Sequence, residues 1–221
     1  ILKLRVMDDY WTLPDARHFG NLVHSVIENT TDFNAINLVS QMDTKAREIL
    51  GADSIVYHFW HKRFVEIAPV LVDVFANKTN HFAEIAGYIK IAGRNVRARA
   101  DRIWDGGVLD IKTGTAPSKK QLMDGNMPQL PLEALMLQSG GFKIRRTQKS
   151  EFPIMQFLQL KNNDVRLIEY DANTTSDMMR AARDKVTELF NIYSAGGASY
   201  EYHETNDQKY KIYDDLARVN D

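Results

Sequence analysis

The middle of the chain carries three consecutive segments with strand character, at about residues 82–92, 95–104 and 107–113. The short turns Gly93-Arg94 and Asp105-Gly106-Gly107 separate these segments, and glycine-containing turns of this kind join antiparallel strands. Stretches with the apolar spacing of helices precede and follow them. Because a small antiparallel sheet needs a covering layer to bury its apolar face, this order predicts a sheet packed against helices.

The rest of the chain fits the same plan. Helical spacing occurs before the strand segments at about residues 18–29, 34–50 and 54–77, and after them at about 117–124, 129–138 and 176–194. Two further strands are expected at about residues 152–160 and 164–171. We therefore predict an α/β fold in which helices flank a central mixed β-sheet, with an added N-terminal helical region.

The length and composition favour a single domain. The 221 residues can bury a substantial core, and 44% hydrophobic with 26% charged residues is ordinary for a globular protein. We expect one domain over residues 1–221, with a helical N-terminal part (1–80), a core (81–195) and a C-terminal tail (196–221). The chain opens on Ile1 without a signal-peptide pattern, so we expect a piece of a longer protein, and no apolar run is long enough to span a membrane.

The chain has no cysteine. This excludes disulfides, cysteine-ligated zinc and cysteine-ligated iron–sulfur clusters. The formal net charge of −1 gives no general reason to bind nucleic acid. Contacts with DNA would therefore have to come from local groups of lysine and arginine rather than from the overall charge.

The turn before the third strand segment brings two carboxylates and a lysine together. Period-two alternation places Asp110 and Lys112 on one face of their strand. If Asp105-Gly106 forms a two-residue turn, Asp101 lies directly opposite Asp110, with Cβ atoms about 4.5–5.5 Å apart. A three-residue turn would shift the register by one residue and separate the two faces.

Facing carboxylates repel each other, and a divalent cation would relieve the repulsion. Mg²⁺ prefers oxygen ligands and commonly takes one or two carboxylates together with waters and a substrate phosphate. A lysine beside the cation can hold the attacking water and neutralise developing phosphate charge. A structural alternative stays open, since most Asp-x-Lys triplets on strands form solvated salt bridges. The facing Asp101 and the apolar neighbours make the metal site as good an explanation as the salt bridge, and these neighbours are Val108, Leu109 and Ile111.

Three motifs in this region resemble the RecB-like nucleases of the PD-(D/E)XK superfamily. They are Ala98-Arg99-Ala100-Asp101-Arg102-Ile103, then Leu109-Asp110-Ile111-Lys112-Thr113-Gly114, then Pro128-Gln129-Leu130-Pro131-Leu132. That family shows G-R-x-D-R-I, then D-Y-K-T-G after a hydrophobic residue, then Q-L-x-x-Y, in this order. Upstream, residues 20–24 resemble the helical G-x-x-x-H element, and residues 1–5 and 213–219 resemble the C-terminal nuclease domain of AddB subunits.

The resemblance implies a restriction-endonuclease-like core and a metal-dependent DNA exonuclease. Its cofactor would be Mg²⁺, with Mn²⁺ as the alternative, and a chain without cysteine would hold no iron–sulfur cluster. The resemblance to AddB implies double-strand-break repair on single strands or duplex ends in the bacterial cytoplasm, with the AddA helicase–nuclease subunit as partner. Two other functions stay open: a catalytically inactive nuclease fold that binds DNA or docks onto a partner, and a stand-alone RecB-like exonuclease.

The resemblance also assigns roles to individual residues. The catalytic residues would be Asp101, Asp110, Lys112 and Gln129. The metal ligands would be His24, Asp101, Asp110 and the backbone carbonyl of Ile111. Gly20, one turn before His24, permits a close approach to the sheet. Glu133 takes the place of the family tyrosine one turn after Gln129, where it can face the same cleft.

Several cationic residues are candidates for contacts with DNA phosphates. Such groups neutralise phosphates without reading the base sequence. The candidates are Arg97, Arg99, Lys119, Lys120, Arg145 and Arg146. By alternation, Arg97 and Arg99 share the strand face of Asp101. For the loop at residues 143–149, a solvated surface explains the basic residues equally well.

Overall fold

The computed structural model describes residues 16–194 apart from residues 52, 77, 80, 144–149 and 162–163. Residues 14–190 form one compact unit of the chain. The elements and the site described below belong to this unit, except that the last helix extends beyond it to residue 194. Arg145 and Arg146, and both chain ends that resemble AddB, lie outside the described residues.

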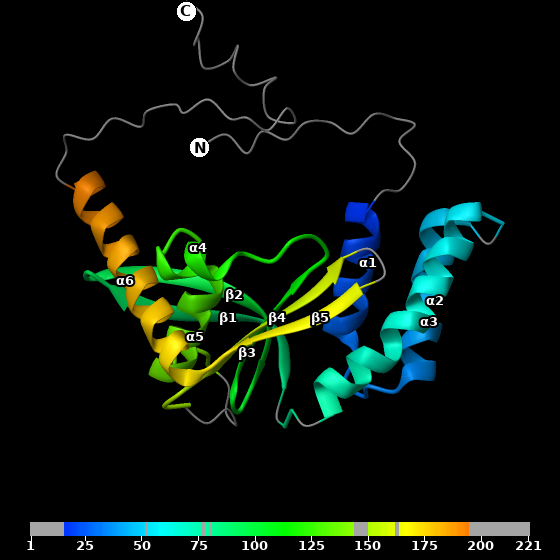
Figure 1. The fold of residues 1–221 in the computed structure, drawn as a ribbon, viewed down its shortest axis with the longest axis horizontal. Helices are drawn as coiled ribbons and strands as arrows, with labels where there is room; N and C mark the ends of the chain where they lie inside the picture. Colours follow the sequence, from blue (N-terminus) through cyan, green and yellow to red (C-terminus); the bar gives the residue numbers. More distant parts are fainter. Residues whose placement is uncertain are drawn as a thin grey trace, which may run out of the picture. The chain divides into compact units, whose positions relative to one another are not determined.

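Three helices precede the sheet, namely α1 (Ala16–Asn29), α2 (Ala35–Leu50) and α3 (Ile55–Ala76). The apolar residues of α1 recur every three or four positions and are buried, and they are Phe19, Leu22, Val23, Val26 and Ile27. Phe19 stacks on Phe64 of α3, with ring centroids 5.5 Å apart. The three helices therefore share one core and form a single covering layer (Figure 1).

The five-stranded sheet has the order β1-β2-β3-β4-β5. The strands are β1 (Phe82–Ile91), β2 (Arg94–Trp104), β3 (Gly107–Lys112), β4 (Ile154–Lys161) and β5 (Asp164–Tyr170). Neighbouring strands are antiparallel except β3 and β4, which are parallel. Parallel neighbours need a crossover connection, and this one contains α4 (Lys119–Met123) and α5 (Gln129–Ser139). The predicted mixed sheet flanked by helices is confirmed (Figure 1).

Two apolar cores cover the two faces of the sheet. Helices α1–α3 pack against one face, where Leu109 and Ile111 of β3 are buried. Helices α4, α5 and α6 (Ala172–Ser194) pack against the other face, where Val108 is buried. Because successive strand residues alternate between faces, Asp110 and Lys112 belong to the α5 face. Among the described helices, none combines the length and the apolar character needed to cross a bilayer.

The hairpin of β2 and β3 has the predicted two-residue turn, because Trp104 pairs with Gly107. The ladder ends two pairs later, before Asp101 and Asp110 would meet. The expectation that these two carboxylates are direct cross-strand partners is therefore wrong. The Asp101 side chain accepts a hydrogen bond from the Ile111 N–H, a donor that a continued ladder would direct to the backbone of β2.

The end of this ladder coincides with an irregularity shared by β1 and β2. The ladder between these two strands leaves out Glu84 and Asp101, which would be partners. Glu84 has φ +51°, in the left-handed region that residues other than glycine rarely adopt. Ala100 and Ile103, three positions apart in β2, both contribute to the core on the α5 face. Alternation therefore shifts by one residue between them, although the pairing register is the same on both sides of the interruption, and Asp101 leaves the regular pattern.

Candidate active site

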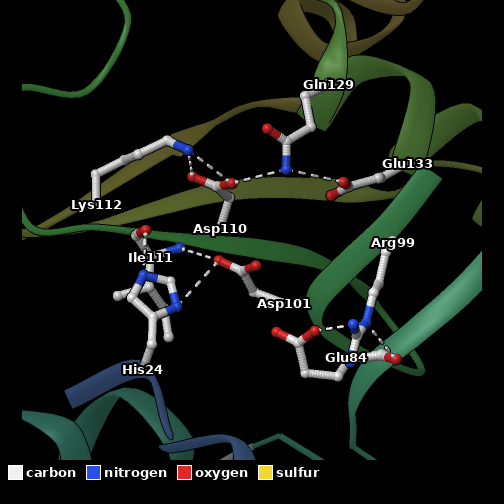
Figure 2. A network of polar contacts seen from close by, with 9 residues as sticks. All are labelled: His24, Glu84, Arg99, Asp101, Asp110, Ile111, Lys112, Gln129 and Glu133. Carbon is white, nitrogen blue, oxygen red and sulfur yellow. Dashed lines mark hydrogen bonds and ion pairs between the residues drawn. The ribbon is translucent and has the colours of Figure 1, made fainter. Parts of the chain in front are cut away.

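Asp110 forms the buried centre of the site, with only 2% of its surface exposed. The Nζ of Lys112 lies 3.0 Å from Oδ1 in a hydrogen bond and 2.8 Å from Oδ2 as an ion pair. Gln129, on the first turn of α5, donates from Nε2 to Oδ1 at 3.2 Å. The fold thus brings these three residues of the second and third motifs together (Figure 2).

His24, Asp101 and the backbone of Ile111 meet beside Asp110. Asp101 Oδ2 accepts a hydrogen bond from the Ile111 N–H at 2.8 Å. His24 donates from Nε2 to the Ile111 carbonyl oxygen at 2.9 Å, and its Nδ1 lies 3.8 Å from Asp101 Oδ2. In Figure 2 these contacts lie below Asp110, whereas Lys112 and Gln129 reach it from above. The four groups that sequence suggested as metal ligands are therefore neighbours around β3.

Helix α1 approaches the strand closely because Gly20 has no side chain. A Cβ atom at this position would clash with the side chain of Thr113, directly after β3. His24, one turn later on the same face of α1, thereby reaches the backbone of Ile111. The expected role of Gly20 in permitting a close approach is confirmed.

Burial raises the pKa of Asp110 to about 6. The Asp101 carboxylate raises it further, whereas Lys112 and His24 favour the charged form and lower it. The negative charge at Asp110 is therefore only partly compensated by its neighbours. A bound cation reverses this balance, because it stabilises the charged form of a nearby carboxylate.

Glu133 is a second buried acid on the same side of the sheet. Gln129 Nε2, which donates to Asp110, also donates to Glu133 Oε1 at 3.2 Å. Glu133 Oε2 has no hydrogen-bond partner among the described residues. Burial, and then the nearby Asp110 carboxylate, raise the pKa of Glu133 to about 9. The side chain that replaces the family tyrosine is thus a neutral carboxylic acid at neutral pH, and it faces the same cluster.

Glu84 of β1 also belongs to the cluster, and sequence reasoning missed it. Burial raises its pKa, Arg99 lowers it, and the nearby Asp101 raises it. Arg99 Nε lies 2.6 Å from Glu84 Oε2. The turn lies at residues 92–93, which brings Glu84 opposite Asp101 in the register, whereas the predicted turn Gly93-Arg94 is one residue too late to do so.

The cationic residues proposed for DNA contacts differ in their surroundings. Arg99 pairs with Glu84 at the edge of the cluster. Arg97 is exposed, and its guanidinium lies 5.7 Å from the ring centroid of Tyr88. Lys119 and Lys120 are exposed at the start of α4. Among the residues that the structure describes, neither Arg97 nor these two lysines pairs with the carboxylate cluster, so phosphate contact stays a prediction for them.

The donor groups around β3 suit a hard divalent cation. Two carboxylates, one backbone carbonyl and one imidazole are ligand types that Mg²⁺ and Mn²⁺ accept. Across the described part of the chain, however, no three His, Cys, Asp or Glu side chains are already arranged to hold a metal ion. His24 is hydrogen-bonded to the Ile111 carbonyl, and Lys112 is paired with Asp110. The donor types therefore suit a divalent cation, but in this structure these groups are bonded to one another.

Comparison with known families bears directly on this arrangement. The family model of the PD-(D/E)XK nuclease superfamily matches residues 4–209. The chain belongs to this superfamily. In a PD-(D/E)XK reading of the motifs described above, Asp101 matches the first acidic residue and residues 110–112 match the (D/E)XK segment.

Relatives of this PD-(D/E)XK chain occur in Rickettsia. An uncharacterized protein of Rickettsia bellii is 31% identical over 168 residues, which cover 65% of this chain and 20% of that protein. Another, from Rickettsia typhi, is 31% identical over 189 residues, which cover 73% of this chain and 21% of that protein. The chain thus spans about a fifth of the length of these relatives. Among solved structures, a candidate exonuclease from Eubacterium rectale aligns with 96% of this chain and 82% of its own, at 10% identity and a TM-score of 0.47.

Proposed function

We propose that this chain is a metal-dependent deoxyribonuclease that hydrolyses phosphodiester bonds at the cluster around β3. One observation carries the proposal. Helix α1 and strands β2 and β3 bring His24, Asp101 and the Ile111 carbonyl together beside Asp110. Asp110 itself is paired with Lys112 at 2.8 Å. A salt bridge on a solvated strand face would leave Asp110 exposed, but this carboxylate is buried.

The proposed cofactor is Mg²⁺ or Mn²⁺, held by Asp101, Asp110, His24 and the Ile111 carbonyl. When bound, such a cation supplies Lewis-acid activation of water and neutralises phosphate charge. Lys112 stands next to these groups, where it can hold the attacking water and stabilise charge on the phosphate. Gln129 donates to Asp110 and fixes its orientation. Glu133, as a neutral acid, holds the same amide without adding negative charge.

The broader role is proposed from the motif resemblance. It favours an exonuclease domain of an AddB-like helicase–nuclease, acting in double-strand-break repair in the bacterial cytoplasm together with AddA. The greater length of the Rickettsia relatives supports a nuclease domain within a longer polypeptide. A stand-alone exonuclease would act without a helicase partner, so activity of the parent protein with and without AddA separates the two.

The direct test is digestion of end-labelled single-stranded and duplex DNA with Mg²⁺, Mn²⁺ or EDTA. We expect cleavage with either metal and none in EDTA. Lys112→Ala should lower the cleavage rate at least about a hundredfold, the usual contribution of a positioned proton-transfer group. Lys185→Ala, on the surface of α6, is the matched control and should cleave normally. An unmutated chain that binds DNA but never cuts it would instead establish an inactive binding module.

A further inference from the structure

A cavity of about 260 Å³ opens directly beside Asp110 and Lys112. The rest of its wall is largely apolar and is formed by Pro117, Met127, Pro128, Leu130 and Phe157. Water, a metal ion or a phosphate would not need such a wall. The cavity therefore indicates an apolar part of the substrate held close to the reacting bond.

The cavity is fixed to the catalytic strand by the sheet itself. Phe157 of β4 is the parallel neighbour of Asp110 in β3, and it is buried. Pro128 immediately precedes α5, whose first residue is Gln129. Met127, in the loop before α5, is 44% exposed. Strands β3 and β4 and helix α5 therefore hold the apolar wall next to the Asp110 carboxylate, and the arrangement does not depend on a loop alone.

The substrate part nearest to a phosphodiester is the nucleoside bonded to it. A base has apolar π-faces, and thioether and aromatic side chains make favourable contacts with such faces. The volume is slightly below the roughly 300–1,000 Å³ typical of pockets for drug-sized ligands. This leaves room for one nucleoside-sized group rather than a stretch of strand.

We propose that this cavity binds the nucleobase next to the cleaved phosphate and that Met127 is a substrate-binding residue. The inference rests on the proposed nuclease function. Only Thr115 and Gln129 add uncharged polar side chains to the lining, so the base is held by shape and contact area and all four bases are accepted. A base enters the cavity only after leaving the helical stack, which costs least in a single strand or a frayed end. The substrate class is therefore unstacked DNA rather than intact duplex.

The test uses single-stranded oligonucleotides in which one abasic residue is placed at successive positions. Cleavage at every phosphate is measured on gels in Mg²⁺. The unmutated chain should cut the phosphate next to the abasic residue about tenfold more slowly, as expected when an apolar pocket loses its occupant. Met127→Asp should cut ordinary DNA about tenfold more slowly and lose the difference between base and abasic residue.

Met123→Asp is the matched control, because this methionine of α4 is also exposed but does not line the cavity. It should behave like the unmutated chain in both respects. Binding of the same oligonucleotides in Ca²⁺, followed by fluorescence anisotropy, gives a readout that does not need cleavage. Weaker binding of the abasic strand than of the ordinary strand, with this difference abolished by Met127→Asp, supports the cavity proposal even if no DNA is cut. The absence of cutting would then refute the nuclease function alone. If the unmutated chain cleaves DNA but cuts and binds the ordinary and the abasic strands equally well, the cavity proposal is overturned and the nuclease function still stands.

Discussion

Asp110 and Glu133 are buried acids that accept a hydrogen bond from the same amide nitrogen of Gln129. Burial is the main cause of both pKa shifts, to about 6 for Asp110 and about 9 for Glu133. At neutral pH one group is therefore a carboxylate and the other a neutral acid. This difference keeps negative charge where the proposed cation would bind and keeps it away from the interior of α5.

The neutral state of Glu133 predicts a pH dependence of stability. Its pKa is raised from 4.5 in the unfolded chain to about 9 in the folded protein, so the folded state retains a proton that the unfolded state releases. Stability should therefore fall as pH rises from about 4.5 to about 9. Glu133→Gln removes this contribution, and melting curves in EDTA between pH 6.5 and 9 should show a smaller loss for the variant.

This pH range lies above the pKa of Asp110, so the ionisation of that group contributes little to the slope. A change of about 1 kcal/mol shifts the melting temperature by roughly 2–4 °C in a domain of this size. Glu188→Gln, on the exposed surface of α6, is the control and should retain the slope of the unmutated chain. Equal slopes for Glu133→Gln and the unmutated chain would mean that Glu133 is ionised in the fold.

His24 gives a second prediction at this scale. Its replacement by alanine should shift the metal concentration for half-maximal cleavage upward by roughly 10–100-fold, with the rate partly restored by excess metal. The remaining carboxylates would still hold the ion, so affinity falls before geometry is lost. His58→Ala, at an exposed position of α3, should leave the titration unchanged. Superimposed titrations for His24→Ala and the unmutated chain would leave His24 with a packing role only.

Individual residues were predictable where a motif fixed their type and order. The motifs named His24, Asp110, Lys112 and Gln129, and the fold brings them to β3. Alternation alone gave the wrong relation between Asp101 and Asp110. It assumes a regular ladder, whereas the Asp101 side chain accepts the Ile111 N–H and the ladder between β1 and β2 is interrupted at Glu84 and Asp101.

Among the elements, helix α1 is attached to the sheet by a buried arginine. Arg102 of β2 donates from Nη2 to the carbonyl oxygens of Ile27 and Thr30, at the end of α1 and just beyond it. Its guanidinium also lies 5.2 Å from the ring centroid of Phe33. Because α1 carries His24, this attachment fixes the helix that completes the site. Arg102, a residue of the first motif, thus has a structural role rather than a chemical one.

Replacing Arg102 with methionine should destabilise the protein by roughly 2–4 kcal/mol. The buried carbonyl oxygens of Ile27 and Thr30 would lose a charged donor, and unsatisfied buried groups are costly. Urea denaturation in EDTA measures the change without involving the proposed metal. Arg97→Met, at an exposed position of the same strand, is the control and should change stability by less than about 0.5 kcal/mol. A similarly small change for Arg102→Met would show that α1 is held by its apolar face alone.

The order and type of the elements followed from periodicity and turn residues, because these are local properties. The apolar spacing predicts that the last helix starts at residue 176, yet α6 begins at Ala172. Asp171 accepts a hydrogen bond from the Thr174 N–H and caps the helix. That N-cap signal was present in the sequence. The φ of +51° at Glu84 was not, since nothing in a β-strand pattern marks a left-handed residue that is not glycine.

Considering the whole molecule, the site unites segments that are far apart in the sequence. His24 comes from the first helix, Asp101 and Asp110 from neighbouring strands, and Gln129 from the crossover between β3 and β4. Amphipathic spacing shows that each helix has a buried face but does not say which face of the sheet it covers. Only the family resemblance indicated that α1 and α5 meet the same strand.

We propose that Asp110 serves a bound cation and not the stability of the fold. The most direct measurement compares melting curves of the unmutated chain and Asp110→Asn at pH 8, in EDTA and with Mg²⁺, Mn²⁺ or Ca²⁺. In EDTA the variant should be as stable or more stable, because the raised pKa of Asp110 means that its buried charge is unfavourable at this pH.

Metal should stabilise the unmutated chain by roughly 2.7 kcal/mol at a hundredfold excess over its dissociation constant, and the variant much less. A variant that is clearly less stable in EDTA, or that gains as much from metal as the unmutated chain, would show instead that Asp110 is a structural partner of Lys112.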